Sequence, residues 1–234
     1  MSEPVVEDDP QSRRRAVVRQ SLSVAVATGL YGVSFGALSV AAGLTTWQTV
    51  ALSLLLFSGG SQFALVGVIA AGGSEVSAVA TSTLLGVRNG LYGLQVNRLL
   101  QARGWRRVLA AHVTIDESTA VGVAQPEPAL SRVGFWWTGL GVFVGWNVTT
   151  FVGALVGNAL GDPRRYGLDA AAVAAFIALL WPRLGTGEAR VVAVGAAAIA
   201  LLLAPHTAAG VPVLAASAAA VVAGLLPRRT QGAR

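Results

Sequence analysis

The sequence of 234 residues contains no cysteine and few charged residues. Without cysteine, the chain forms no disulfide bond and no thiolate metal site, and its redox compartment is left open. Charged residues make up 12% of the chain, compared with roughly 25% in ordinary soluble domains. Hydrophobic residues make up 54%. This composition is typical of an integral membrane protein.

Motifs that mark enzyme active sites are also missing. The sequence has no HExxH motif, no phosphate-binding loop and no cluster of metal ligands. We therefore expect no catalytic residue, no bound metal and no cofactor. The chain is not expected to be an enzyme.

Apolar segments recur along nearly the whole chain, and several reach the length of about 20 residues that crosses a hydrocarbon core. The seven segments are Ser21–Gly43, Trp47–Gly73, Val76–Val96, Val133–Leu160, Leu168–Leu184, Val191–Ala204 and Val211–Leu226. An eighth stretch, Val108–Ala124, contains His112, Asp116 and Glu117, so hydropathy does not decide whether it crosses. The pattern predicts an all-α fold, a polytopic integral membrane helix bundle.

The net charge of +6 comes from basic residues in short clusters between the apolar segments. A nucleic-acid-binding protein would carry them along one polar face, so we expect no nucleic-acid partner. Four arginines between positions 13 and 19 place the N-terminus in the cytoplasm under the positive-inside rule. We thus predict a cytoplasmic tail at 1–20, a single multi-pass transmembrane domain at 21–227 in the cell membrane, and a cytoplasmic tail at 228–234.

The second apolar segment is interrupted. Its two halves, WQTVALSLLLF and FALVGVIAA, are joined by Ser58, Gly59, Gly60, Ser61 and Gln62. Each half covers only about 15 Å at 1.5 Å per residue. A re-entrant hairpin would return the next basic cluster to the cytoplasm, as the positive-inside rule requires. A simple loop between short helices is the alternative, and counting arginines also permits a bundle with eight crossings.

The 28 glycines are spaced for close helix packing. Gly141, Gly145, Gly153 and Gly157 recur at multiples of four, a spacing that lets another backbone approach closely in a membrane. The pairs at positions 32 and 36 and at positions 86 and 90 have the same spacing. We assign these glycines to packing and not to a site.

Arg88 lies in the middle of an apolar helix, within LLGVRNGLYGLQ. A charge there costs about 2.5 to 3.5 kcal/mol on insertion scales, so we expect Arg88 to face the protein interior and to have an acidic partner. The best-placed acids are Asp116 and Glu117 in HVTIDESTAVGV. A permanent structural ion pair is the alternative to a functional one.

Taken together, the intramembrane cation, the acidic pair and the broken helix suit a zwitterion with an apolar side chain, with Phe57 and Phe63 as part of an apolar wall. The residues expected to bind such a substrate are Ser58, Gly59, Gly60, Ser61, Gln62, Arg88, Asn89 and Tyr92.

Four stretches in order resemble the AzlC-like family of branched-chain amino-acid export permeases. They are FSGGSQFALVGVIAAG, LLGVRNGLYGLQ, TIDESTAVG and GDPRRYGLD. The resemblance runs from about Ser21 to Leu226.

This resemblance implies the large subunit of a two-component exporter of branched-chain amino acids, which works with a small AzlD-like membrane subunit in the lipid bilayer. It also implies transport driven by the proton gradient, with Asp116 or Glu117 as the proton-carrying residue. A structural or assembly subunit and a passive channel for small solutes are the alternatives.

Overall fold

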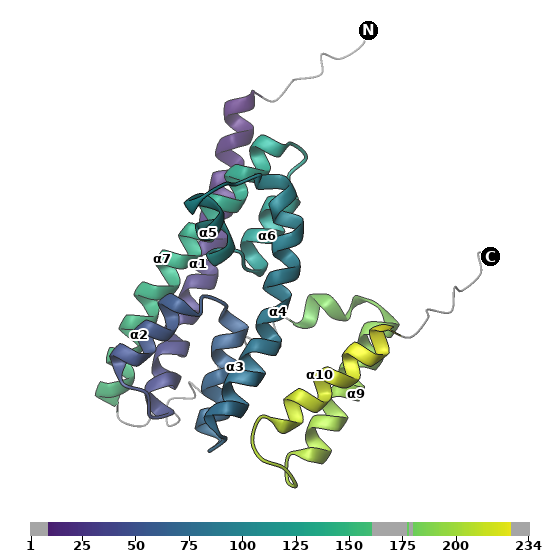
Figure 1. Ribbon diagram of the computed structural model, residues 1–234. Helices are drawn as coiled ribbons and strands as arrows, with labels where there is room; N and C mark the ends of the chain where they lie inside the picture. The colour runs from purple at the N-terminus through teal and green to yellow at the C-terminus, as the bar shows by residue number, and fades with distance from the viewer. Residues whose placement is uncertain (1–8, 161–176, 178–179, 226–234) are drawn as a thin grey trace, which may run out of the picture.

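The computed structural model describes residues 9–160, 177 and 180–225, and all regular secondary structure in this part of the chain is helical. The predicted all-α class is confirmed. The helices are α1 (Pro10–Ala41), α2 (Thr46–Leu55), α3 (Gly59–Ala70), α4 (Glu75–Leu100), α5 (Trp105–His112), α6 (Asp116–Val123), α7 (Pro128–Leu160), the 3₁₀ helix η2 (Trp181–Gly185), α9 (Gly187–Leu203) and α10 (Val211–Leu225) (Figure 1). The predicted tail at 228–234 and most of the span at 168–184 lie outside the described residues.

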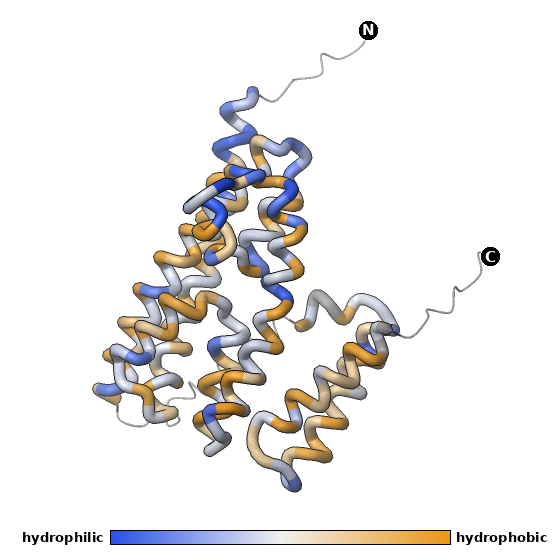
Figure 2. The backbone as a smooth tube through the Cα atoms, in the orientation of Figure 1, coloured by the Kyte–Doolittle hydropathy of each residue, from blue (hydrophilic) through white to orange (hydrophobic). Residues whose placement is uncertain are grey.

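Among the described helices, α1 and α7 are long and apolar enough to cross a membrane by length and composition. Helix α3 and residues Val211–Val222 of α10 are apolar but shorter. Polar residues gather at the end of the bundle where α1 begins and α4 ends (Figure 2). The number of crossings therefore stays a prediction.

Helix α1 begins at Pro10, well before the apolar stretch that starts at Ser21. Asp9 caps it by accepting a hydrogen bond from the backbone N–H of Gln11, and proline is favoured in the first helical turn. Arg13 forms an ion pair with Glu127, just before α7. The basic segment that was predicted as a tail is thus helical from Pro10 onward.

Helices α1 and α7 pack along the predicted glycine stripe. A methyl group added at Gly36 would lie 2.1 Å from the carbonyl oxygen of Thr150, and one added at Gly153 would lie 2.1 Å from that of Val33. The predicted packing role of these glycines is confirmed. On α4 the prediction is wrong for Gly90, whose added methyl group would meet no described atom within 4 Å, because this face of α4 borders a groove.

We expect Gly153→Ala to lower the thermal unfolding temperature of the purified protein markedly. The added methyl group would overlap the α1 backbone, which cannot rotate away as a side chain can, and overpacking of this kind costs about 1–3 kcal/mol. Gly195→Ala in α9 is the matched control, since its methyl group would enter open space. Equal unfolding temperatures for the two variants in one detergent would contradict close packing of α1 on α7.

The predicted interruption of the second segment is present, but its position differs. Helix α2 ends at Leu55 and α3 begins at Gly59. The non-helical residues are Leu56, Phe57 and Ser58, whereas Gly59 to Gln62 form the first turn of α3. The carbonyl of Ser58 accepts from the N–H groups of Ser61 and Gln62, so the helix starts directly after the serine.

The undecided stretch Val108–Ala124 is also broken, between α5 and α6 at Val113 to Ile115. The α2–α3 pair and the α5–α6 pair enter the bundle from opposite ends, and their turns approach each other (Figure 1). The rings of Phe57 and His112 lie 6.1 Å apart at this meeting point, and both contact Phe143 of α7. Two half-length hairpins therefore meet inside the bundle.

Candidate functional site

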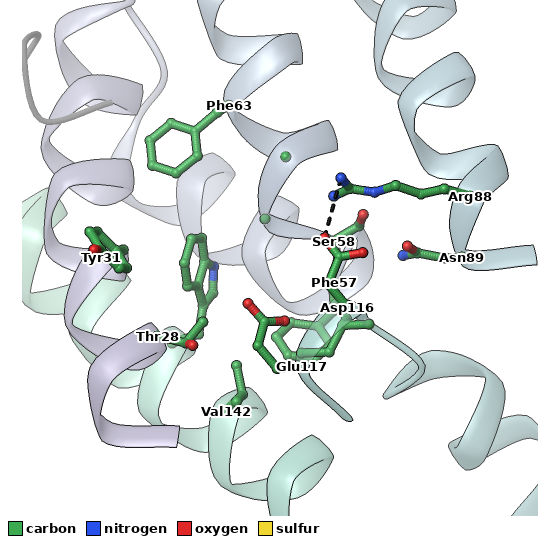
Figure 3. Close-up of a pocket in the computed structure, with 14 residues that line it drawn as sticks. Thr28, Tyr31, Phe57, Ser58, Phe63, Arg88, Asn89, Asp116, Glu117 and Val142 are labelled. Atoms are coloured by element: carbon green, nitrogen blue, oxygen red, sulfur yellow. Dashed lines mark ion pairs between the residues drawn. The ribbon is translucent and has the colours of Figure 1, made fainter. Parts of the chain in front are cut away.

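A cavity of about 160 Å³ lies where the two hairpin turns meet. Helices α1, α4 and α7 complete its wall, and several of its side chains point into the same space (Figure 3). Its lining residues are Thr28, Tyr31, Phe57, Ser58, Gly59, Gly60, Phe63, Arg88, Asn89, Ile115, Asp116, Glu117, Val142 and Trp146.

Arg88 extends from α4 to Asp116, the first residue of α6 (Figure 3). The distance from Nη1 of Arg88 to Oδ2 of Asp116 is 3.3 Å, and the side chains are 29% and 14% exposed. The predicted ion pair is thus present. Glu117 lines the same cavity. Both acids stand in the first turn of α6, where the helix dipole favours negative charge.

The start of α3 is built to accept the guanidinium. A methyl group at Gly60 would lie 2.7 Å from Nη2 of Arg88, so a larger residue there would displace the guanidinium from this position. The side chain of Ser58 does not cap α3 and instead shares a hydrogen bond of 3.1 Å with the hydroxyl of Ser61. The positive end of α3 and the positive side chain of Arg88 therefore adjoin the cavity on one side, which favours an anion there.

We expect Gly60→Ala to weaken binding of a small zwitterion in the cavity about tenfold without unfolding the protein. The methyl group would push the guanidinium aside but keep its charge, and misplacement of a binding group by up to about 1 Å has large effects. The same change at Gly67, in the same helix, meets open space and is the matched control. Equal affinities of the two purified variants for such a zwitterion would show that the position of the guanidinium beside Gly60 is unimportant.

Of the residues predicted to bind substrate, Ser58, Gly59, Gly60, Arg88 and Asn89 line the cavity. The remaining predicted substrate residues, Ser61, Gln62 and Tyr92, are not among the lining residues.

The side chain of Gln62 is fully buried and turns back toward α2. Its amide nitrogen donates to the backbone carbonyls of Leu52 and Ser53, at 3.4 and 3.3 Å. Both carbonyls stand in the last turn of α2, and that of Leu52 also accepts from the N–H of Leu56. Gln62 therefore closes the hairpin. Tyr92 is half-buried one turn beyond Arg88 on α4.

The uncharged part of the cavity wall includes more residues than the sequence predicted. Phe57 and Phe63 line the cavity as expected, but Thr28, Tyr31, Ile115, Val142 and Trp146 were not foreseen. The spacing from Thr28 to Tyr31 and from Val142 to Trp146 places each pair on one helix face. That spacing was the available signal, although it also fits ordinary packing.

The arrangement combines a guanidinium, two carboxylates, an uncapped helix start and an apolar wall. Such a site suits a small zwitterion, because its opposite charges and its apolar part each meet a complementary surface. Within the described part of the chain, no group of three or more histidine, aspartate or glutamate side chains is placed to hold a metal ion.

The described residues form a helical protein with two helices apolar enough to cross a membrane and a small, charged internal site. A family model described as "AzlC protein" matches residues 23–160, more than half of the chain and all of the lining residues. The chain belongs to the AzlC family.

Two similar proteins come from two strains of Helicobacter pylori, and each is described as an uncharacterized membrane protein. They are 27% and 26% identical to this chain over 140 residues, which is 59% of this chain. The match spans 61% of the length of each relative. No solved structure matches.

Proposed function

We propose that the chain is the large subunit of a membrane transporter that exports branched-chain and other small hydrophobic amino acids. It crosses the cell membrane several times with its N-terminus in the cytoplasm, and it works with a small AzlD-like subunit. Membership of the AzlC family and the chemistry of the cavity support this proposal.

The observation that carries the proposal is the Arg88–Asp116 ion pair on the wall of the cavity. A fixed structural pair would be expected in a packed region, whereas this one borders space that a ligand can enter. Arg88 would hold the substrate carboxylate, the acids of α6 would hold the ammonium group, and Phe57 and Phe63 would enclose the aliphatic side chain.

The two hairpins favour transport over a purely structural role. In many transporters, broken helices meet near the middle of the membrane, and their ends hold the substrate and the coupling ion. Here the turns before α3 and before α6 meet at the cavity. Protonation of Asp116 or Glu117 would couple export to the proton gradient, because carboxylates inside membrane proteins are common proton carriers.

Helix α9 offers a surface for lipid or for the small subunit. In the described part of the chain it buries no residue, and Val191, Val194, Leu201 and Leu202 are exposed. These aliphatic side chains would face the hydrocarbon or a neighbouring helix.

The proposal is tested by flux from vesicles preloaded with valine, leucine or isoleucine. The purified chain would be reconstituted with and without the small subunit, and a pH gradient would be imposed or collapsed. Saturable export that needs the small subunit and accelerates with the gradient is the expected result. Export that neither saturates nor responds to the gradient would indicate a passive channel, and absence of export would indicate a structural or assembly subunit.

A further inference from the structure

Trp146 of α7 carries a buried hydrogen-bond donor that no side chain or backbone group of the described residues satisfies. The residue is 4% exposed and lines the cavity. Its indole N–H has no acceptor within the described residues. Buried tryptophan N–H groups usually have a partner, so an acceptor is expected from whatever occupies the cavity.

The ring is held in place by its neighbours. It is stacked on Phe35 with ring centres 5.9 Å apart and contacts Phe63 edge-to-face at 6.1 Å. A methyl group added at Gly59 would lie 3.5 Å from the ring edge. The indole therefore has little freedom to turn toward another acceptor.

Trp146 and Arg88 flank the start of α3. Gly59 adjoins the indole, and the next residue, Gly60, adjoins the guanidinium. The side chain of Ser58 leaves this helix start uncapped. The guanidinium and the first N–H groups of α3 thus adjoin one side of the cavity, and the benzo edge of the indole, which lines the same cavity, lies against Gly59.

We propose that Trp146 is a specificity-determining residue whose indole N–H donates to the carboxylate of the bound amino acid, beside Arg88. This inference rests on the proposed function. An indole N–H can only donate, and an ammonium group can only donate, so the carboxylate is the one acceptor that a zwitterionic aliphatic amino acid offers to Trp146. Trp146 thereby selects ligands that carry an acceptor at this end and disfavours amines that lack it.

The test compares valine with isobutylamine, which is valine without its carboxylate. Binding of both to the purified transporter is measured for the wild type, Trp146→Phe and Trp137→Phe. Phenylalanine keeps an aromatic ring but removes the donor. Trp137, on the same helix and 45% exposed, is the matched control. We expect Trp146→Phe to bind valine roughly ten- to a hundredfold more weakly, as for loss of a hydrogen bond to a charged group, with unchanged binding of isobutylamine and unchanged behaviour of the control.

Equal binding of valine to the wild type and Trp146→Phe would overturn the inference and leave the proposed function intact. Equal weakening of valine and isobutylamine would also overturn it, because a change in cavity shape affects both. Failure of the wild type to bind any branched-chain amino acid would instead overturn the proposed function.

A second measurement needs no variant at position 146. In the ¹⁵N-labelled protein, the indole N–H resonance of Trp146 is identified as the one that persists when each of the other tryptophans is replaced in turn by phenylalanine. Addition of valine should shift this resonance. Isobutylamine should not shift it. An unshifted resonance with valine bound would contradict donation by Trp146.

Discussion

Arg88→Lys is expected to reduce export of valine, leucine and isoleucine roughly ten- to a hundredfold while changing the unfolding temperature little. The planar guanidinium can hold a carboxylate through two parallel hydrogen bonds, whereas an ammonium group presents a point charge. Loss of one hydrogen bond between charged groups corresponds to about 1.5–3 kcal/mol. Export from preloaded vesicles and thermal unfolding of the same preparation are the two measurements.

Two further variants make this result interpretable. Arg88→Gln should abolish export, because it removes the cation as well as its geometry. Arg132→Lys should behave as the wild type, since Arg132 is exposed on α7 and donates to the carbonyl of Leu99, away from the cavity. Normal export by both Arg88 variants would assign Arg88 a structural role only.

The first hairpin could be predicted because its signal is local. Two apolar halves, each too short to cross, flank adjacent glycines between polar residues. The prediction placed the break a few residues late, since Gly59 and Gly60 also permit a helix start when the carbonyl of the preceding Ser58 accepts from the N–H groups of Ser61 and Gln62. Hydropathy shows that a helix is broken but not where its hydrogen-bonding pattern resumes.

The second hairpin has no such signal. Its turn at Val113, Thr114 and Ile115 contains neither glycine nor proline. The chain turns there because Ser118 accepts a hydrogen bond from the N–H of Ile115 and donates one to the carbonyl of Val113, at 3.0 and 2.7 Å. A serine with these partners looks in sequence like any other helix residue.

The ion pair could be predicted from energy alone, because an arginine within an apolar helix needs an acid and few acids were near apolar sequence. The place of the Trp146 indole in the cavity wall could not be predicted in this way. Trp146 lies on α7, whose residue spacing was already explained by the stripe of glycines that packs on α1. The periodicity of one helix does not show which neighbouring helix covers each of its faces. The folded structure reveals that this tryptophan lines the cavity and that Gly59 approaches its ring.

Asp116→Asn is expected to lower the unfolding free energy by about 1–3 kcal/mol and to abolish proton-driven export. Breaking a fully buried pair costs about 3–5 kcal/mol, and partial exposure of Arg88 and Asp116 reduces that figure through solvent screening. Thermal unfolding and flux are measured on the same variants, with Asp9→Asn, at the exposed start of α1, as the control for loss of a carboxylate.

The double variant Arg88→Gln with Asp116→Asn separates the structural role of the pair from the functional one. Two neutral amides leave no unmatched charge at these two positions, so the double variant should regain most of the stability lost by Asp116→Asn. It should still fail to export, because it would lack both the cation proposed to hold the substrate carboxylate and the carboxylate proposed to carry the proton. A double variant that regains both stability and export would show that the pair only holds α4 against α6. Recovery of stability without export would show that export needs the charges of Arg88 and Asp116. The fold of the double variant would then be intact, and only the chemistry of these two side chains would differ from the wild type.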